Sequence, residues 1–237
     1  MNEELLNVNN GKTKEHNFTY KNLLVVILSI LGFSFLIGMF IALVAGIYGE
    51  EAVKSITEGY YILIVDAIVT IFVLFLYKPA RNFIADIWDM TVFKTIKTYI
   101  YILIGFIVIS LSQYIIIGLL GVETAEQQRN QLGVTTIQNI IQSIIFIFSV
   151  AVITPIKEEM VYRGILYRFL EKKYSFIIGI VISSAIFGFL HGGFPITAMI
   201  MGMVFVILFK KTQSILPSIV LHIIWNLIVC IFTILSL

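Results

Sequence analysis

The sequence predicts an all-α membrane protein that crosses the bilayer several times. Hydrophobic residues make up 59% of the 237 residues and charged residues only 13%. A soluble domain of this length could not bury so much apolar surface. Most of the apolar runs have roughly the 17 to 25 residues that a helix needs to span a bilayer, and none alternates as a membrane β-strand does. We therefore expect a polytopic helical protein with about seven transmembrane helices.

Seven apolar stretches are the candidate spans. In chain order they are Leu23–Ile47, Tyr60–Tyr77, Tyr99–Leu120, Ile137–Ile153, Phe176–His191, Ile196–Phe209 and Ile215–Leu235. The first is longer than the roughly 7 to 15 residue core of a cleavable signal peptide, so it should stay attached. The sixth, at about fourteen residues or roughly 21 Å, is shorter than the ~30 Å hydrocarbon core. We expect the backbone break at 192–195 to lie inside the bilayer beside a wet cavity.

The segment between the second and third stretches, residues 78–98, has an amphipathic pattern. Phe83, Ile87 and Met90 are spaced as on one helix face, and Trp88 can anchor at an interface. We expect an extra helix lying on the cytoplasmic surface. Within the second stretch, Asp66 is compatible with a buried hydrogen-bonding group, and also with a group that contacts an active cavity or relays protons.

The distribution of Lys and Arg predicts the orientation. With seven spans and a cytoplasmic N-terminus, only Lys54 and Arg129 of the 16 basic residues lie on the outer side. We expect a multi-pass protein of the cell membrane, with the lipid bilayer as a constant partner. The net charge of +2 and the lack of a basic stripe argue against a nucleic-acid partner. The single cysteine, Cys230, excludes an intrachain disulfide and is expected to be a packing residue.

A charged passage at residues 154–173 interrupts the apolar sequence. Glu158 and Glu159 are adjacent, and Arg163 follows Glu159 by four residues. On a helix this spacing pairs Glu159 with Arg163 and leaves Glu158 on another face. A charge at membrane depth is costly unless it is paired or faces a wet cavity. Glu158 is therefore the first candidate for chemistry.

Two further pairs of polar and aromatic residues follow, each at i, i+4 spacing and so on one helix face: Phe187 with His191, and His222 with Asn226. Helix geometry places Glu158 roughly 21 Å and His191 roughly 24 Å from the turn that joins their helices, at nearly the same depth. His222, roughly 12 Å inward, leaves a mismatch of a few ångströms. Each residue also has a structural interpretation, as a packing histidine or as an interhelical amide.

At these positions the sequence resembles the CPBP family of intramembrane proteases, the CAAX-processing and bacteriocin-processing group also called Abi. The motifs E-E-x-x-x-R, F-x-x-x-H and H-x-x-x-N occur in the family's order over about seventy residues. The first three stretches match only in being hydrophobic. The expected organisation is a cytoplasmic tail at 1–22, a scaffold of three spans plus the interfacial helix at 23–135, and a catalytic core of four spans at 136–237.

The resemblance implies a role for each motif residue. Glu158 activates the attacking water with help from His191, His222 and Asn226 stabilise the oxyanion, and the supporting residues are Glu159, Arg163 and Phe187. The family is commonly labelled as metalloproteases, so zinc held by Glu158, His191 and His222 is an alternative. The absence of a compact H-E-x-x-H helix favours a metal-independent water activated by glutamate.

The resemblance implies a membrane-associated peptide or protein as substrate. Some family members act on prenylated CAAX termini and others on bacterial peptide precursors. Richness in Ile, Lys and Asn is typical of an AT-rich bacterial genome, which favours the second type. Two other functions remain open: a proton-coupled transporter that uses Asp66, Glu158 and His191 as a relay, and a non-catalytic immunity protein that binds a peptide.

Overall fold

The computed structural model describes residues 18–49, 53, 59–124, 126–127, 137 and 139–235. Throughout these ranges the regular elements are helices, and they contain no strand. The expected all-α polytopic fold is therefore confirmed. Most of the expected cytoplasmic tail, together with Lys54 and Arg129 of the expected outer loops, lies outside the described residues.

The helices follow one another with few long connections. In chain order they are α1 (Tyr20–Tyr48), α3 (Gly59–Leu76), α4 (Lys78–Phe83), the 3₁₀ helix η1 (Met90–Lys94), α5 (Ile96–Gln113), η2 (Tyr114–Leu119), α7 (Ile140–Ile147), η3 (Phe148–Ile153), α8 (Thr154–Glu159), η4 (Met160–Tyr167), α9 (Arg168–Lys173), α10 (Phe176–Leu190), α11 (Pro195–Thr212) and α12 (Leu216–Leu235). Segments η2, η3 and η4 are π-helical. Elements α7 to α9 together form one continuous helix over Ile140–Lys173.

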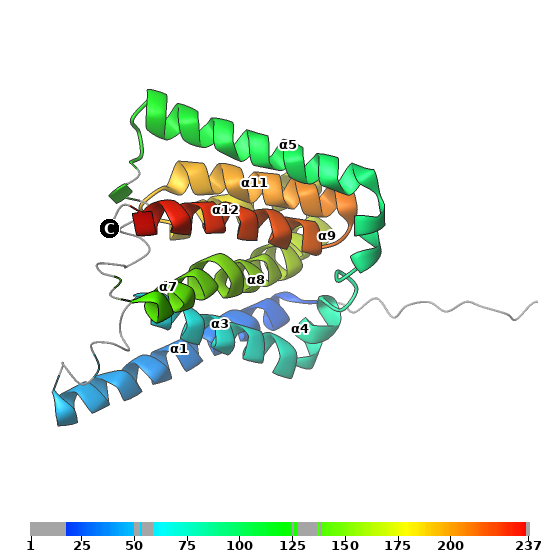
Figure 1. The fold of residues 1–237 in the computed structure, drawn as a ribbon. Coiled ribbons are helices and arrows are strands. Elements are labelled where there is room, and N and C mark those ends of the chain that lie inside the picture. The colour runs from blue at the N-terminus through cyan, green and yellow to red at the C-terminus, as the bar shows by residue number, and fades with distance from the viewer. Residues whose placement is uncertain are drawn as a thin grey trace, which may run out of the picture.

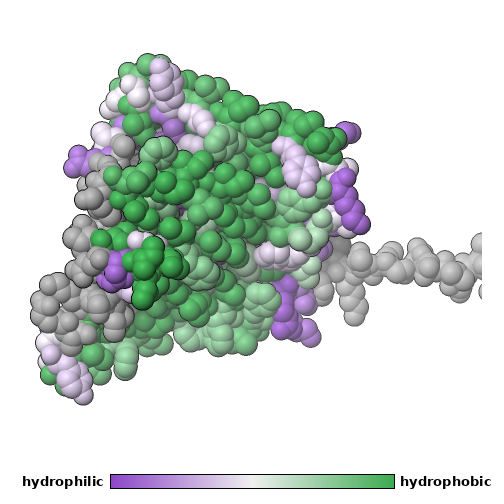
Figure 2. All heavy atoms as spheres, viewed as in Figure 1, coloured by the Kyte–Doolittle hydropathy of each residue, from purple (hydrophilic) through white to green (hydrophobic). Residues whose placement is uncertain are grey.

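The apolar stretches of the sequence correspond to these helices. Five helices in the described ranges are long and apolar enough to cross a membrane: Tyr20–Tyr48, Ile96–Leu119, Ile140–Lys173, Pro195–Thr212 and Leu216–Leu235. Two shorter apolar helices, Tyr60–Leu76 and Phe176–Leu190, account for the remaining two stretches. Hydrophobic residues cover the face of the bundle that Figure 2 shows, and hydrophilic residues gather near the two ends of this face. This distribution suits a protein surrounded by lipid.

The helices pack in an order that places the long helix at the centre. Helix α5 borders one side through α11 and α12, whereas α1 lies at the opposite side and packs on α3 (Figure 1). Helix α3 in turn contacts η3 and α8, and α12 contacts the same two segments from the other side. The charged passage of α8 and η4 is therefore enclosed by protein rather than by lipid.

Helices α10 and α11 approach each other more closely than side chains normally allow. A Cβ atom at Gly188 would lie 2.8 Å from the Cβ of Met199, and one at Gly202 would lie 3.0 Å from the Cβ of Ser184. Glycine removes this clash, as small residues do at helix contacts in membranes. The close contact fixes the short turn between the two helices, which begins at His191.

The amphipathic segment after α3 differs from the expected surface helix. Helix α4 ends at Phe83 and η1 begins only at Met90. Between them, the carbonyl of Ile87 accepts a hydrogen bond from the N–H of Ile215 at 2.9 Å, so this backbone is bonded to the α11–α12 turn. The prediction of one interfacial helix over 78–98 is therefore wrong. Phe83 and Ile87 are buried in the core, whereas Met90 is 67% exposed.

Glu123, in the segment after η2, is buried at the start of α11. Its carboxylate accepts hydrogen bonds from the N–H groups of Ile196 at 2.6 Å and Thr197 at 3.2 Å, and from the Thr197 hydroxyl. A carboxylate here satisfies amides that have no partner within the helix and interacts favourably with the helix dipole. The segment after α5 is thereby bonded to the first turn of α11. Sequence analysis had assigned no role to Glu123.

Candidate active site

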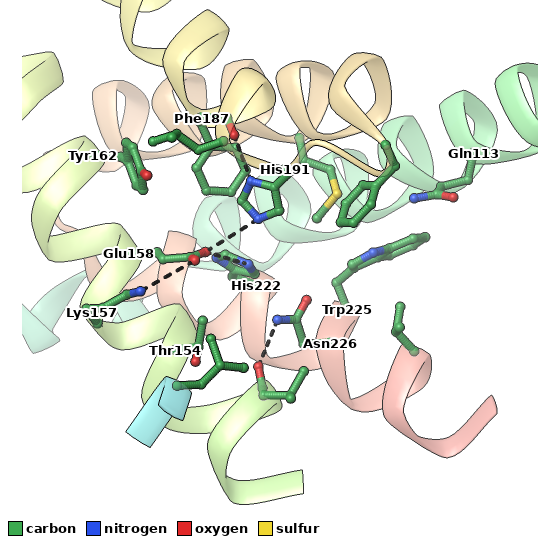
Figure 3. A pocket seen from close by; sticks show the side chains of 16 residues that line it. Gln113, Thr154, Lys157, Glu158, Tyr162, Phe187, His191, His222, Trp225 and Asn226 are labelled. Carbon is green, nitrogen blue, oxygen red and sulfur yellow. Dashed lines mark hydrogen bonds and ion pairs between the residues drawn. The ribbon is translucent and has the colours of Figure 1, made fainter. Parts of the chain in front are cut away.

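Glu158 and Glu159 end α8 near the middle of the bundle, and both are buried. Glu159 accepts a hydrogen bond from Arg163 at 2.8 Å, and the same carboxylate oxygen lies 3.0 Å from Nδ1 of His222. The i, i+4 pair predicted from the spacing is therefore confirmed. Glu158 points instead into a cavity between the helices (Figure 3).

The buried guanidinium of Arg163 connects three helices. Beyond its bond to Glu159, it donates to the carbonyl of Gly202 in α11 at 3.2 Å. Its central carbon lies 4.5 Å from the ring centroid of Phe187 in α10 and 4.9 Å from that of Phe205 in α11. Additional hydrogen bonds make a buried ion pair more stable, and aromatic faces attract the cation. Phe187 is thus packed against the ion pair.

Two imidazole rings approach the free carboxylate. Nε2 of His191 lies 4.0 Å and Nε2 of His222 lies 3.8 Å from the same oxygen, Oε2, of Glu158 (Figure 3). The expected mismatch in depth of His222 is absent. Although the two residues come from different helices, their rings point at one oxygen across a space in which a water molecule could lie between them.

The other ring nitrogen of each histidine already has a partner. Nδ1 of His191 lies 2.7 Å from the carbonyl oxygen of Phe187, and Nδ1 of His222 lies beside the Glu159 carboxylate. Both partners accept hydrogen bonds, so in each neutral ring the proton belongs on Nδ1 and Nε2 carries a lone pair. A ring that gains a second proton becomes a donor at Nε2. Both rings can therefore take up a proton on the side that faces Glu158.

Asn226 lies one turn beyond His222 on α12 and completes the polar side of the cavity. Its Nδ2 donates one hydrogen bond to the carbonyl of Val150 at 2.9 Å, which holds the amide in place. The cavity has a volume of about 290 Å³. Its lining combines a polar group with many apolar side chains: Leu63, Gln113, Val150, Thr154, Lys157, Glu158, Tyr162, Phe187, Leu190, His191, Phe194, Met201, His222, Trp225, Asn226 and Val229.

Comparison with protein families identifies the region that carries these residues. Residues 140–228 match the model of the family described as Type II CAAX prenyl endopeptidase Rce1-like. The matched region covers less than half of the chain and is similar to the Rce1-like CAAX endopeptidases. This result confirms the resemblance inferred from the three motifs, all of which lie between Glu158 and Asn226 within the matched region. Searches of curated proteins and of solved structures found no match to the chain.

One charged contact of the site reaches outside the matched region. Nζ of Lys157 lies 2.8 Å from Oδ2 of Asp66 in α3 and 3.8 Å from Oε1 of Glu158, and the Lys157 side chain is only 13% exposed. The distribution of basic residues predicts that Lys157 and Arg163 both lie on the cytoplasmic side. The structure places both inside the bundle, and Asp66 is linked to the cavity through Lys157.

Lys157 is a site residue that sequence reasoning missed. A signal was present, because an intramembrane carboxylate such as Asp66 needs a partner. A lysine directly before Glu158 was a candidate for that partner. Tyr162 and Trp225, which also line the cavity, gave no signal beyond their hydrophobicity.

The residues considered as zinc ligands do not have the geometry of a metal site. Two ligands bound 2.0–2.1 Å from a tetrahedral zinc lie about 3.3 Å apart. Oε2 of Glu158 is 3.8 Å from His222 and 4.0 Å from His191. In the described part of the chain, no group of three or more His, Cys, Asp or Glu side chains is arranged to hold a metal ion. The mechanism below therefore involves no step through a metal.

Proposed function

We propose that the protein is an intramembrane endopeptidase that hydrolyses a peptide bond of a membrane-associated peptide or protein with a water molecule activated by Glu158. The observation that carries this proposal is the enclosed carboxylate of Glu158, which faces a cavity together with the lone-pair nitrogens of His191 and His222. The match of residues 140–228 to the Rce1-like family model supports the class of reaction.

In this mechanism, Glu158 takes a proton from water as the water oxygen attacks the carbonyl carbon of the substrate. The new C–O bond forms a tetrahedral intermediate, and the C–N bond then breaks as the protonated carboxyl gives its proton to the departing nitrogen. A positioned base of this kind accelerates a reaction by roughly 10²–10⁴-fold. His191 assists by accepting a hydrogen bond from the same water through Nε2, because its Nδ1 proton is held by the Phe187 carbonyl.

His222 and Asn226 stabilise the negative charge that develops on the carbonyl oxygen. The amide nitrogen of Asn226 has a second hydrogen, beyond the one donated to Val150, that can point into the cavity. His222 donates from Nε2 when its ring is charged, while its Nδ1 proton is donated to the Glu159 carboxylate. Fixed donors at such a position are among the largest contributions to acyl-transfer catalysis.

The proposed substrate is a peptide segment that reaches the cavity from the membrane. Apolar side chains form most of the lining, among them Leu190, Phe194 and Trp225, and they suit a hydrophobic segment. Prenylated CAAX termini and hydrophobic bacterial precursors both have this character.

We further propose that the protein lies in the cell membrane with its N-terminus in the cytoplasm. We also propose that the chain is divided into a cytoplasmic tail (1–22), a transmembrane scaffold (23–135) and a catalytic core (136–237).

The test is cleavage by purified protein in lipid nanodiscs. Two substrates are used: a farnesylated peptide with a CAAX terminus, and an unprenylated hydrophobic precursor peptide. We expect the wild type to cleave at least one of them and Glu158→Gln to reduce the rate at least 10²-fold. Cys230→Ala is the matched control, since Cys230 is buried one turn after Asn226 but does not line the cavity. Wild-type rates in the Glu158→Gln protein would refute the assignment of the base.

A further inference from the structure

The two oxygens of the Glu158 carboxylate have different neighbours. Oε2 faces both imidazoles, whereas Oε1 faces the ammonium group of Lys157 at 3.8 Å (Figure 3). The terminal torsion of a glutamate is broad, so its own side chain does not fix the plane of the carboxylate. The ammonium group on one side therefore selects the orientation that presents Oε2 to the space between the rings.

Lys157 itself is held by a residue from another helix. Its flexible four-carbon stem would not locate the charge alone, but Nζ is bonded to Asp66 of α3 at 2.8 Å. Lys157 is the one Lys or Arg among the described residues that line the cavity. Arg163, a further cation near Glu158 in the described part of the chain, is bonded to Glu159 and to Gly202. No other cation along the described lining can take the place of Lys157 beside Oε1.

We propose that Lys157, anchored by Asp66, is a positioning residue that orients the Glu158 carboxylate for its attack on water. This inference rests on the hydrolytic function proposed above and adds to it a residue pair that no motif contains. Asp66 lies outside the matched region, so the inference gives α3 a part in the reaction. Asp66 acts through Lys157, and Lys157 acts through Glu158.

A direct role of Lys157 in binding an anionic group of the substrate is less favoured by the geometry. Its ammonium already lies between two carboxylates, those of Asp66 and Glu158. An additional anion would have to approach these two negative charges in an enclosed site of low dielectric constant. The two roles differ in kinetics, because loss of orientation lowers kcat whereas loss of ground-state binding raises KM.

The experiment compares five proteins in the nanodisc assay: wild type, Lys157→Met, Lys157→Arg, Asp66→Asn and the double variant Lys157→Met/Asp66→Asn. Methionine keeps the length of the stem and removes the charge. We expect Lys157→Met to lower kcat by about 10–100-fold with KM changed by less than about 3-fold, as for a misplaced catalytic group. Lys157→Arg should recover most of the rate. Asp66→Asn should lower kcat when Lys157 is present. In the Lys157→Met background, the same change should lower kcat no further.

Several results would overturn the proposal. These are wild-type kcat in Lys157→Met, a raised KM with unchanged kcat, or independent effects of the Asp66 and Lys157 changes. If Lys157→Met fails to fold, Asp66→Asn alone carries the test, and wild-type kcat in this variant would overturn the proposal. Loss of activity in Glu158→Gln with full activity in Lys157→Met would remove the positioning role and leave the hydrolytic function standing. An inactive wild type would refute the hydrolytic function, and the positioning role with it.

Discussion

Glu158 and Glu159 show how one residue position changes the role of a carboxylate. One step along a helix turns the side chain by about 100°. This rotation directs Glu159 to the interior, where Arg163 and His222 bind its oxygen. The same rotation directs Glu158 to the cavity, where no described hydrogen bond occupies the carboxylate and its neighbours lie at 3.8–4.0 Å. The structure therefore supports the proposal that Glu159 has a structural role and that Glu158 carries the chemistry.

This difference predicts unequal effects of the two alanine variants on stability. Glu159→Ala should lower the free energy of unfolding by about 3–5 kcal/mol, because it leaves the buried Arg163 guanidinium without its counter-charge. Glu158→Ala is the matched control and should cost much less. Unfolding of both purified variants in detergent, followed by circular dichroism, measures the effect. Equal losses in the two variants would contradict the assignment of roles.

At the residue scale, the sequence predicts local pairs better than long-range ones. Helical spacing alone predicts that Glu159, rather than Glu158, pairs with Arg163, and this is confirmed. The partner of Lys157 lies 91 residues away on α3, and no spacing rule can reveal such a contact. The convergence of His191 and His222 on one oxygen also depends on helix packing. The chemical roles proposed for the cavity residues remain predictions: Glu158, His191, His222 and Asn226.

At the element scale, the α10–α11 hairpin places His191, and Gly188 permits the close approach of its two helices. Gly188→Ala should reduce both stability and kcat/KM, because the added Cβ would lie 2.8 Å from the Cβ of Met199. Overpacking of this kind typically costs about 1–3 kcal/mol. Melting temperature and cleavage rate are the two measurements.

Gly192→Ala is the matched control for the hairpin. A Cβ at Gly192 would meet no atom within 4 Å, and its backbone does not require glycine. We expect this variant to keep the stability of the wild type. A Gly188→Ala protein that is as stable and as active as Gly192→Ala would show that the close approach of the helices does not matter.

The connection between α4 and η1 is bound to α9 by a two-pronged ion pair. Both carboxylate oxygens of Asp86 accept hydrogen bonds from Arg168 at 2.8 Å. Partial burial raises the pKa of Asp86, but the hydrogen bonds and the charge of Arg168 lower it by more, so the pKa lies below its usual value. The pair therefore stabilises the fold above the ordinary Asp pKa of about 3.9, and this stabilisation is lost as the pH falls through the lowered value.

We expect Asp86→Asn to reduce stability at pH 7 by about 0.2–1 kcal/mol, the range of solvent-screened pairs, because the Asp86 side chain is 68% exposed. The difference from the wild type should shrink as the pH falls below about 4. Thermal unfolding across this range measures it, with the exposed carboxylate variant Glu126→Gln as control. A difference that grows in acid would have the wrong sign.

The elements themselves were predicted more completely than their ends. Each of the seven apolar stretches corresponds to a helix, because a long hydrophobic run in a membrane must satisfy its backbone internally. The segment over 78–98 was predicted wrongly. Its helical spacing of apolar residues was real, but the carbonyl of Ile87 bonds to Ile215 instead of to its own helix. A bond between segments so far apart in sequence overrides the local pattern.

At the scale of the whole molecule, the proposed hydrolytic mechanism uses no metal, and the described residues contain no group of three or more His, Cys, Asp or Glu side chains arranged to hold one. We expect cleavage to persist after dialysis against a zinc chelator, because the donors around Glu158 Oε2 stand 3.8 Å and 4.0 Å away. The rate before and after chelation, with and without added zinc, is the measurement. Loss on chelation with recovery on addition of zinc would instead favour a metalloprotease.

The Glu123 carboxylate lies outside the region that matches the family model, yet it binds a helix that lines the cavity. It seats the first turn of α11, and that turn directly follows the loop that carries His191 and Phe194. A displacement of the segment that contains Glu123 would therefore also displace the wall of the cavity that His191 and Phe194 form. The residues before the matched region are therefore more than a frame around it, because Glu123 supports the first turn of α11 beside the cavity. A chimera that joins only residues 140–228 to other helices should lack the Glu123 contacts that support this wall of the cavity.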